Sequence, residues 1–316
     1  MKENIEEIQV KIPHRITGFF EIVSIKSGNQ YDKPENIGSK GAGFTLNAFG
    51  FTKIKVKPLD NGEDSICHIY INNEKLDEKA FTSNFIYNYI KHLISKPKMI
   101  KIYHNFELPV ESGYGASGAG ALGLIFGLNK VLNLNLSDLE CGRIAHISEV
   151  INETGLGTVC GQLNLGLSIL KKAGYPCVCE RIHIPKNISV ITTSFGKIST
   201  KSILTDEKVR SRIIDVGKKT YQKFIKNPTI ETFVRLSLNF VEKTDIINLL
   251  DLPKVRELLF QLNKERIIGS SMNQLGRSVY AICKNKDVKE LIEIFRSYQT
   301  KDNIYVLKIN EKGLKN

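Results

Sequence analysis

Several features that define other protein classes are missing from this 316-residue chain. No apolar run approaches the roughly 20 residues that a membrane-spanning helix needs. The first residues, Met1-Lys2-Glu3-Asn4, lack the apolar centre of a secretory signal. The motif G-x-x-x-x-G-K-[ST] occurs nowhere, which excludes the common P-loop. We therefore expect a cytoplasmic protein with no membrane partner.

The cysteines show no organised spacing. They stand at positions 67, 141, 160, 177, 179 and 283, unlike a disulfide framework or a zinc site. Cys177 and Cys179 are the only close pair, and on a strand their side chains would point to opposite faces. We expect buried free thiols rather than metal ligands.

The charge is strongly positive but scattered. Lysine and arginine total 45 against 33 acidic residues, a net charge of +12 that attracts anions, including nucleotides and nucleic acid. However, no lysine run is longer than Lys171-Lys172 or Lys218-Lys219, and aromatic residues are not interleaved with the basic ones. We therefore expect no nucleic-acid partner.

The most informative segment is a glycine-rich loop at residues 109–121. An apolar, strand-like run precedes it and a helical pattern follows it to Leu132. With so few side chains, a ligand can approach the backbone N–H groups and the positive end of the following helix, which suits phosphate. We expect a nucleotide-binding loop. Its expected ligand contacts are Pro109, Gly113, Tyr114, Gly115, Ala116, Ser117, Gly118, Ala119 and Gly120.

Two other interpretations of this loop must be weighed. A glycine-rich turn that only lets a helix pack closely explains one or two of the glycines, but not all four. Gly113, Gly115 and Gly118 also satisfy G-x-G-x-x-G, the dinucleotide-binding fingerprint. That fingerprint requires a strand directly before it, whereas a proline-containing segment intervenes here. It also requires an acidic residue near the end of the next strand, whereas Asp138 and Glu140 open a helix.

The order of elements predicts an α+β protein rather than a regular alternation of strands and helices. We expect a boundary between a nucleotide-binding domain at residues 1–175 and a second domain at 176–316. The expected strands are 8–12, a hairpin of 43–46 with 51–57, 66–71, 99–106, 178–184, 189–194, 279–283 and 303–309. The expected helices are 77–95, one ending at 132, one opened by the N-cap Ser137, 206–225, 229–243, 253–263 and 288–298.

With these segments in place, the chain resembles the GHMP kinases, whose phosphate loop reads P-x-x-x-G-x-G-S-S-A-A or close to it. Pro109, Gly113, Gly115 and Ser117 carry that motif here. Within the superfamily the chain is most similar to the archaeal pantoate kinases. Further stretches at 13–21, 38–43, 145–157, 196–200 and 269–276 extend the similarity over about residues 10–285.

This resemblance implies the two-lobed GHMP kinase fold, with the active site in the cleft between the lobes. It implies ATP and Mg²⁺ as cofactors. It also implies phosphate transfer to the primary hydroxyl of (R)-pantoate, giving (R)-4-phosphopantoate in coenzyme A biosynthesis. Because relatives are often dimers, a homodimer is expected. Two alternatives stay open: a kinase for another small alcohol of the homoserine or mevalonate type, and a catalytically weak nucleotide-binding homologue.

The resemblance also assigns catalytic and metal-binding roles. Ser117 would reach the metal or the β-phosphate, or cap the helix. Glu149 would be the carboxylate ligand of Mg²⁺ rather than a solvated helix residue. Thr158 stands where pantoate kinases usually carry the aspartate of Gly-Leu-Gly-Asp. Because a threonine hydroxyl accepts no proton near neutral pH, a general base is missing there. Either positioning and Mg²⁺ suffice for a loose transition state, or catalysis has been lost.

The remaining expectations concern the acceptor. The carboxylate of pantoate should meet a cation, for which Arg15 and Lys40 are candidates, with a plain surface charge as the alternative for each. The other expected acceptor contacts are Thr17, Ser39, Gly269, Ser270 and Ser271. We expect His146 to be a packed, hydrogen-bonded residue rather than a catalytic one.

Overall fold

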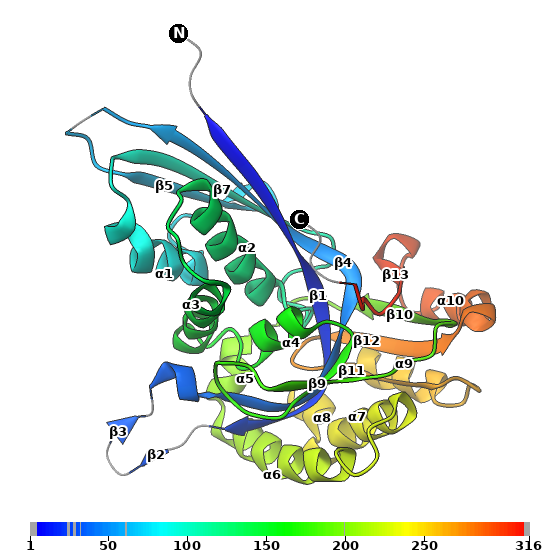
Figure 1. Ribbon diagram of the computed structural model, residues 1–316. Coiled ribbons are helices and arrows are strands. Elements are labelled where there is room, and N and C mark those ends of the chain that lie inside the picture. The colour runs from blue at the N-terminus through cyan, green and yellow to red at the C-terminus, as the bar shows by residue number, and fades with distance from the viewer. Residues whose placement is uncertain are drawn as a thin grey trace.

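Two long antiparallel strands run through the computed structural model of the protein and connect its two halves (Figure 1). β1 (Glu6–Val23) pairs with β4 (Gly38–Pro58) along its whole length. The register shifts twice, between Pro13 and Arg15 and between Thr17 and Phe19, and such irregularities bend a strand. The structure describes residues 5–23, 26–27, 30–31, 33–60, 62–198 and 200–312, so Ser199 of the 196–200 segment lies outside it.

The strands form two main sheets. The larger has the order β6-β5-β7-β4-β8-β9, with β1 also paired to β4, and the smaller has the order β11-β12-β10-β13. The remaining strands are β2 (Lys26–Ser27), β3 (Gln30–Tyr31), β5 (Ile66–Ile71), β6 (Glu74–Lys75), β7 (Lys98–Phe106), β8 (Leu167–Leu170), β9 (Cys179–Ile182), β10 (Ile188–Ser194), β11 (Gly269–Asn273), β12 (Ser278–Lys284) and β13 (Ile304–Leu307).

Helices lie against both sheets, as the predicted α+β class requires. The α-helices are α1 (Phe81–Ile90), α2 (Ala116–Val131), α3 (Asp138–Ile151), α4 (Thr158–Asn164), α5 (Thr200–Thr205), α6 (Glu207–Phe224), α7 (Ile230–Thr244), α8 (Ile246–Leu249), α9 (Pro253–Leu262) and α10 (Val288–Arg296). Short 3₁₀ turns are η1 (Pro34–Asn36), η2 (Lys91–Leu93), η3 (Asn285–Asp287) and η4 (Lys301–Asn303). None of the helices in this described part combines the length and hydropathy that a bilayer crossing requires.

Helix α2 packs closely on β4. A Cβ atom on Gly123 would lie 2.4 Å from Thr52 Oγ1, so only glycine permits helix and sheet to approach this far. Around this contact Ile54, Ile102 and Leu122 are fully buried. Dense packing here holds the N-terminal end of α2, and the loop before it, in a fixed position relative to the sheet.

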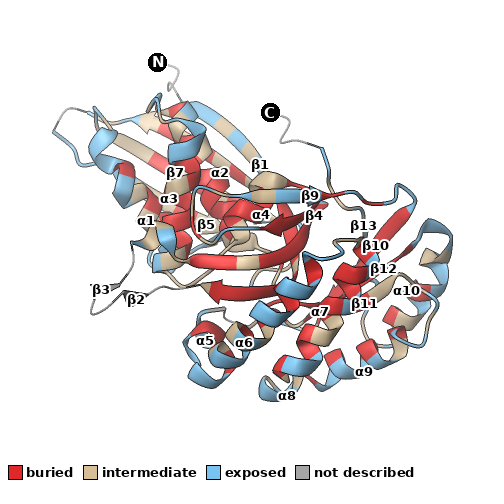
Figure 2. Cartoon of the chain, turned by 60° about the horizontal axis from the view of Figure 1, so that its bottom comes forward, coloured by how far each residue is buried: buried red, intermediate tan, exposed pale blue. Residues whose placement is uncertain are grey.

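A second core joins the long strands to the helices of the other half. Phe19 and Phe224 pack edge-on with ring centroids 5.2 Å apart, and Phe44 packs edge-on against Tyr280 at 5.6 Å. Figure 2 shows buried positions following β4 and the strands of the smaller sheet. Because β1 and β4 contribute to both cores, the two halves share a continuous backbone support.

Several expected elements need correction. The hairpin predicted from 43–46 and 51–57 is wrong, because β4 continues through the intervening residues, where Phe49 pairs with Pro13 and Gly50 with Ile12. The helix expected over 77–95 is shorter, since a turn occupies residues 77–79 before α1. The boundary expected at residue 175 falls between β8 and β9, which pair in one sheet. The division into 1–175 and 176–316 stays a prediction.

The start of α3 is a complete capping box. Ser137 Oγ accepts from the backbone N–H of Glu140 at 3.3 Å, while Glu140 Oε2 accepts from the backbone N–H of Ser137 at 2.8 Å. We expect Ser137→Ala to lower the free energy of unfolding by about 1 kcal/mol. Urea denaturation measures this loss. Ser137→Asn, which also caps well, should retain most of the stability, and equal losses in both variants would contradict the capping role.

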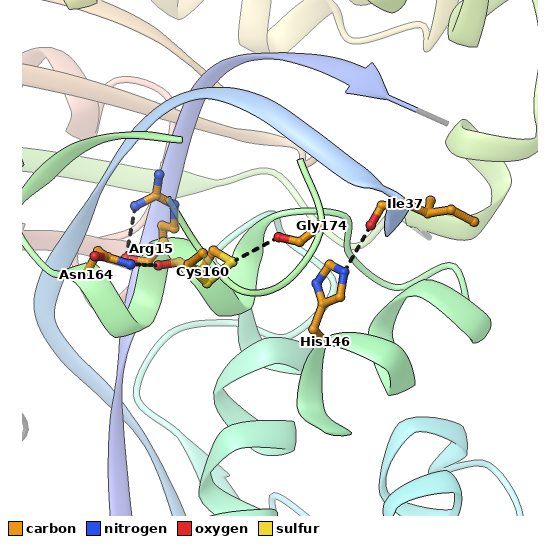
Figure 3. The surroundings of a disulfide bond; sticks show 8 residues. Arg15, Ile37, His146, Cys160, Asn164 and Gly174 are labelled. Carbon is orange, nitrogen blue, oxygen red and sulfur yellow. Dashed lines mark hydrogen bonds between the residues drawn. A yellow bond between two sulfur atoms is a disulfide. The ribbon is translucent and has the colours of Figure 1, made fainter. Parts of the chain in front are cut away.

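One cysteine pair corrects the expectation of free thiols. Cys160 on α4 forms a disulfide with Cys177, 17 residues further along, and Gly174 O lies 3.7 Å from Cys160 Sγ (Figure 3). The chain passes through β8 and turns back before Cys177, so the pairing depends on tertiary structure that no local spacing reveals. Four described cysteines are free, namely Cys67, Cys141, Cys179 and Cys283, and only Cys141 and Cys283 are fully buried.

Candidate active site

A cavity of about 790 Å³ lies where elements of both sheets meet. The larger sheet and its helices contribute most of the walls, and segments next to the smaller sheet complete them. The residues that line it include Arg15, Thr17, Phe19, Ser39, Thr82, His104, Gly113, Tyr114, Gly115, Ala116, Ser117, Thr154, Leu156, Thr158, Leu170, Gln274 and Leu275. Such a site between two structural units is the cleft that the sequence predicts.

The glycine-rich loop forms one wall of this cavity. α2 begins at Ala116 with Gly115 as its N-cap residue, and no side chain caps the helix. The first N–H groups of a helix have no partner within it, and its dipole makes this end positive. An anion such as phosphate is therefore favoured at this wall. The possibility that Ser117 is an N-cap is ruled out, because it lies inside the helix.

Two glycines in the loop are required by geometry. Gly115 has φ +69°, in the left-handed region, and a Cβ there would lie 2.8 Å from Thr158 Cγ2. A Cβ on Gly118 would lie 2.6 Å from Gln162 Oε1 and 2.9 Å from Thr158 Cγ2. The loop therefore packs against α4, whose first residue is Thr158. Gly115 lines the cavity, whereas Gly118 faces α4 and the Glu149 carboxylate, so the packing of α2 on the sheet does not by itself account for both glycines.

The side chain of Tyr114 holds the loop in place rather than contacting a ligand. Its ring is buried, and its hydroxyl lies 2.8 Å from Thr192 Oγ1 on β10. Its carbonyl accepts from the backbone N–H of Arg15 at 3.0 Å. Burial raises the pKa of the Tyr114 phenol, which stays neutral. The side chain thus anchors the loop to the smaller sheet, and only the backbone is left for a ligand.

Glu149 lies directly behind the cavity wall. It is 1% exposed, and Oε2 has no hydrogen-bond partner among the described residues. Thr154 donates to Oε1 at 3.0 Å, and Thr82 Oγ1 lies 3.4 Å from both Ser117 Oγ and Thr154 Oγ1. Burial raises the pKa of Glu149, while hydrogen bonds from Ser117 and Thr154 act in the opposite direction. The alternative of a solvated glutamate is therefore wrong.

Thr158 lines the cavity beside this carboxylate. A Cβ on Gly155 would lie 2.2 Å from Glu149 Oε2 and 3.0 Å from Thr158 Oγ1, so the two side chains converge on one point. The described residues contain no group of three or more His, Cys, Asp or Glu that could hold a metal ion. Any cation here would depend on Glu149 and hydroxyl oxygens.

The predicted acceptor residues separate into two groups. Arg15, Thr17 and Ser39 line the cavity. Lys40 does not, because neighbouring strand residues point to opposite faces, and its Nζ pairs with Glu21 Oε2 at 3.2 Å.

Gly269, Ser270 and Ser271 also lie away from the cavity wall. They belong to β11, where Ser270 Oγ donates to Asn263 Oδ1 at 2.9 Å. Gln274 and Leu275, the residues that follow β11, line the cavity in their place. The cavity therefore contacts this segment a few residues beyond the predicted positions. Pro109, Gly118 and Ala119 likewise support the loop without lining the cavity.

Sequence reasoning missed the hydroxyls of Thr82 and Thr154 and the amide of Gln274. Thr154 and Gln274 lie within segments that the resemblance singled out, at 145–157 and 269–276, but neither was named as a site residue. Thr82 belongs to α1 and Thr154 follows α3, so tertiary structure alone brings them to Ser117. His146 matches its expectation, since its Nε2 lies 2.9 Å from Ile37 O and its ring is buried.

The wall also contains a neutral histidine. His104 is buried, with Nδ1 2.9 Å from Thr52 Oγ1 and Nε2 3.1 Å from Ser83 Oγ. Burial lowers its pKa from 6.5 to about 4. The unfolded chain therefore binds a proton first on acidification. The contribution of neutral His104 to the free energy of unfolding is complete above pH 6.5. It is lost as the pH falls from 6.5 toward 4, by about 1.4 kcal/mol per pH unit.

We expect His104→Asn to be less stable than the parent at pH 7.5, with a gap that narrows by pH 4.5. Urea midpoints across this range measure the gap. His183→Gln, a change at an exposed histidine, serves as the control and should show the pH profile of the parent. A gap that stays constant with pH would contradict a neutral His104.

Comparisons with known proteins agree with this geometry. Residues 84–165 match the GHMP kinases N terminal domain. The chain is 34% identical over 285 residues to a pantoate kinase of Methanocaldococcus jannaschii, covering 90% of this chain and 96% of the relative. The chain belongs to the GHMP kinases. A pantoate kinase of Thermococcus kodakarensis is 28% identical, with 90% of each chain covered.

Solved structures show that the fold of this GHMP kinase is shared. One described as a phosphotransferase related to the CoA biosynthesis pathway superposes with a TM-score of 0.82 at 24% identity, covering 98% of this chain and 97% of the other. The homoserine kinase from Cytophaga hutchinsonii superposes at 0.67 with 15% identity, covering 99% and 98%. This GHMP kinase is therefore a small-molecule kinase with the α+β fold of its relatives.

Proposed function

We propose that this GHMP kinase transfers the γ-phosphoryl group of ATP to the primary hydroxyl of (R)-pantoate, forming (R)-4-phosphopantoate for coenzyme A biosynthesis. The observation that carries the proposal is the 34% identity to a pantoate kinase across 96% of that relative's length. The cavity is large enough for a nucleotide and a small acceptor together, since ligand sites of this kind measure about 300–1,000 Å³.

Phosphoryl transfer depends on positioning and charge neutralisation more than on covalent chemistry by the protein. The backbone N–H groups from Gly113 to Ser117 would hold the phosphates at the N-terminus of α2. Tyr114 fixes that loop through Thr192 on the smaller sheet. Both halves of the protein therefore position the donor.

The residues around Glu149 fit a Mg²⁺ ion. Magnesium prefers oxygen ligands, usually one or two carboxylates completed by phosphate oxygens and water. Here a buried carboxylate oxygen has no protein partner, and Ser117 and Thr154 bring hydroxyls beside it. When bound, Mg²⁺ would neutralise charge on the phosphates. Glu149 and Ser117 would hold it, and Thr154 would orient Glu149.

Thr158 cannot serve as a general base. We infer that the acceptor proton leaves late, after the bond from the γ-phosphorus to the leaving ADP oxygen has loosened, and that it passes to an oxygen of the transferred phosphoryl group, so that positioning supports turnover. Thr158 is the single feature that favours the alternative, a nucleotide-binding homologue with little turnover. The homodimer remains a prediction from the resemblance, and the cytoplasmic location remains a prediction from the sequence.

The test is ADP release measured with and without pantoate, at several Mg²⁺ concentrations, with homoserine and mevalonate as alternative acceptors. We expect ADP release that depends on both pantoate and Mg²⁺. Release with another acceptor but not with pantoate would overturn the assigned substrate. Tight ATP binding without turnover on any acceptor would support the non-catalytic homologue instead.

A further inference from the structure

Arg15 is a buried arginine with an unusual environment. It lies on β1 and is 2% exposed. Its Nη1 donates to Gly161 O of α4 and to Ser168 Oγ of β8, each at 3.2 Å. A Cβ on Gly161 would lie 2.2 Å from Arg15 Cζ, so the guanidinium packs flat on α4. Figure 3 shows the side chain beside this helix, near Cys160 and Asn164.

No carboxylate compensates this charge. Within the described part of the chain, the partners of the guanidinium are a carbonyl and a hydroxyl, and no ion pair involves Arg15. Burial lowers its pKa only to about 10, so the group remains charged at neutral pH. A buried charge is costly unless an opposite charge meets it. An arginine that also lines a cavity is therefore suited to bind an anion from that cavity.

The residue at position 158 makes this charge available. A Cβ on Gly115 would lie 2.8 Å from Thr158 Cγ2 and 3.7 Å from Arg15 Cβ, so these two residues are close neighbours. An acidic residue at this position would place a negative charge beside Arg15 and compete with an external anion. Threonine is neutral and leaves the positive charge unopposed.

The direction of the guanidinium separates it from the phosphate loop. The backbone of Arg15 contacts the loop through Tyr114 O, but the charged group reaches away from it, to Gly161 and Ser168. The lining of the same cavity includes Leu156, Leu170 and Leu275, and Gln274 Oε1 is a buried oxygen with no hydrogen-bond partner among the described residues. A cation, an unpaired amide oxygen and apolar walls together fit a small hydroxy acid with a branched hydrocarbon centre.

We propose that Arg15 binds the carboxylate of the acceptor and is the residue that selects pantoate over uncharged alcohols of the same shape. Gln274 accepts a hydrogen bond from the second hydroxyl of the acceptor, and the leucines contact its methyl groups. This inference rests on the proposed function and adds the residue that determines which acceptor is chosen. The other anion available to Arg15 is the transferred phosphoryl group, and the experiment distinguishes the two.

The test compares pantoate with its primary amide, which keeps both hydroxyls and the methyl groups but carries no charge. We expect the parent to prefer pantoate in kcat/KM, and Arg15→Gln to lower kcat/KM for pantoate about 100-fold, mainly through KM. The value for the amide and the KM for ATP should change little. Arg181→Gln is the control, because this exposed arginine also donates to α4, at Asn164 O, but lies outside the cavity wall.

Three results would overturn the inference. Equal losses for pantoate and the amide with a raised KM for ATP would assign Arg15 to the phosphates. Unchanged kinetics would leave it without a role in recognition. If Arg15→Gln does not fold, Arg15→Lys carries the test. An unchanged KM for pantoate in this variant, which keeps the charge but lacks the planar fork, would count against recognition of the carboxylate by the guanidinium.

Binding measurements keep this test separate from the proposed function. Titration calorimetry with pantoate and a non-hydrolysable ATP analogue reports acceptor affinity without turnover. If the parent binds pantoate but releases no ADP, the kinase proposal fails while the role of Arg15 can still be measured. If pantoate binds the parent and Arg15→Gln equally, the specificity inference fails while the kinase proposal stands.

Discussion

Glu149→Gln is expected to lower kcat by about 10²–10³-fold, the loss typical of removing one preorganised electrostatic group from a site of charge development. The glutamine keeps the shape and the contact with Thr154 but carries no negative charge. Because Glu149 is the buried carboxylate behind Ser117, its charge would be the main protein contribution to holding the Mg²⁺ ion of the proposed function. The coupled ADP assay should also show that more Mg²⁺ is needed for half-maximal rate.

Glu153→Gln is the matched control. Glu153 lies close to the end of the same helix, but its side chain is 42% exposed and pairs with Lys201 at 3.3 Å. An exposed pair of this kind contributes little, so kcat and the Mg²⁺ dependence should stay near those of the parent. Equal effects in the two variants, or full activity in Glu149→Gln, would remove Glu149 from the metal site.

The fold was predictable where the signal is local. The 66–71 run is β5, and the Ser137 cap opens α3 with both expected hydrogen bonds. The long strands were not predictable, because bulges near Pro13 and Thr17 interrupt the alternation in β1 and glycines interrupt it at the start of β4. Strand pairing over such distances is decided by tertiary contacts rather than by propensity.

The candidate site divides in the same way. The phosphate loop has a local signature, because backbone approach requires glycine at positions such as 115. Thr82 and Thr154 have none, since a threonine is informative only once its neighbours in space are known. The same holds for Arg15: sequence reasoning could name it as a cation, but its burial and lack of a carboxylate partner emerge only from the packing of β1 against α4.

Gly118→Ala should damage both the fold and the nucleotide site. The added methyl group would lie 2.6 Å from Gln162 Oε1. Gln162 cannot easily move away, because its Nε2 donates to Pro13 O and Gly115 O, each at 2.9 Å. We expect a loss of about 1–3 kcal/mol in unfolding free energy from overpacking. We also expect kcat/KM for ATP to fall about 100-fold, because the loop shifts relative to Glu149.

Gly120→Ala, two residues further along the same helix, provides the comparison. Its nearest neighbours, in Phe106 and His104, would lie at 3.5 and 3.6 Å, an ordinary van der Waals contact. Alanine is the better helix former, so this variant should gain about 0.5–1 kcal/mol and keep its activity. Urea unfolding and steady-state kinetics are measured on both proteins. If α4 and Glu149 constrain the loop at position 118, the unfolding free energy falls in Gly118→Ala and rises in Gly120→Ala. If Gly118→Ala is as stable and as active as Gly120→Ala, the loop can move freely against α4. The phosphate site would then lack the rigid support that the kinase proposal assumes.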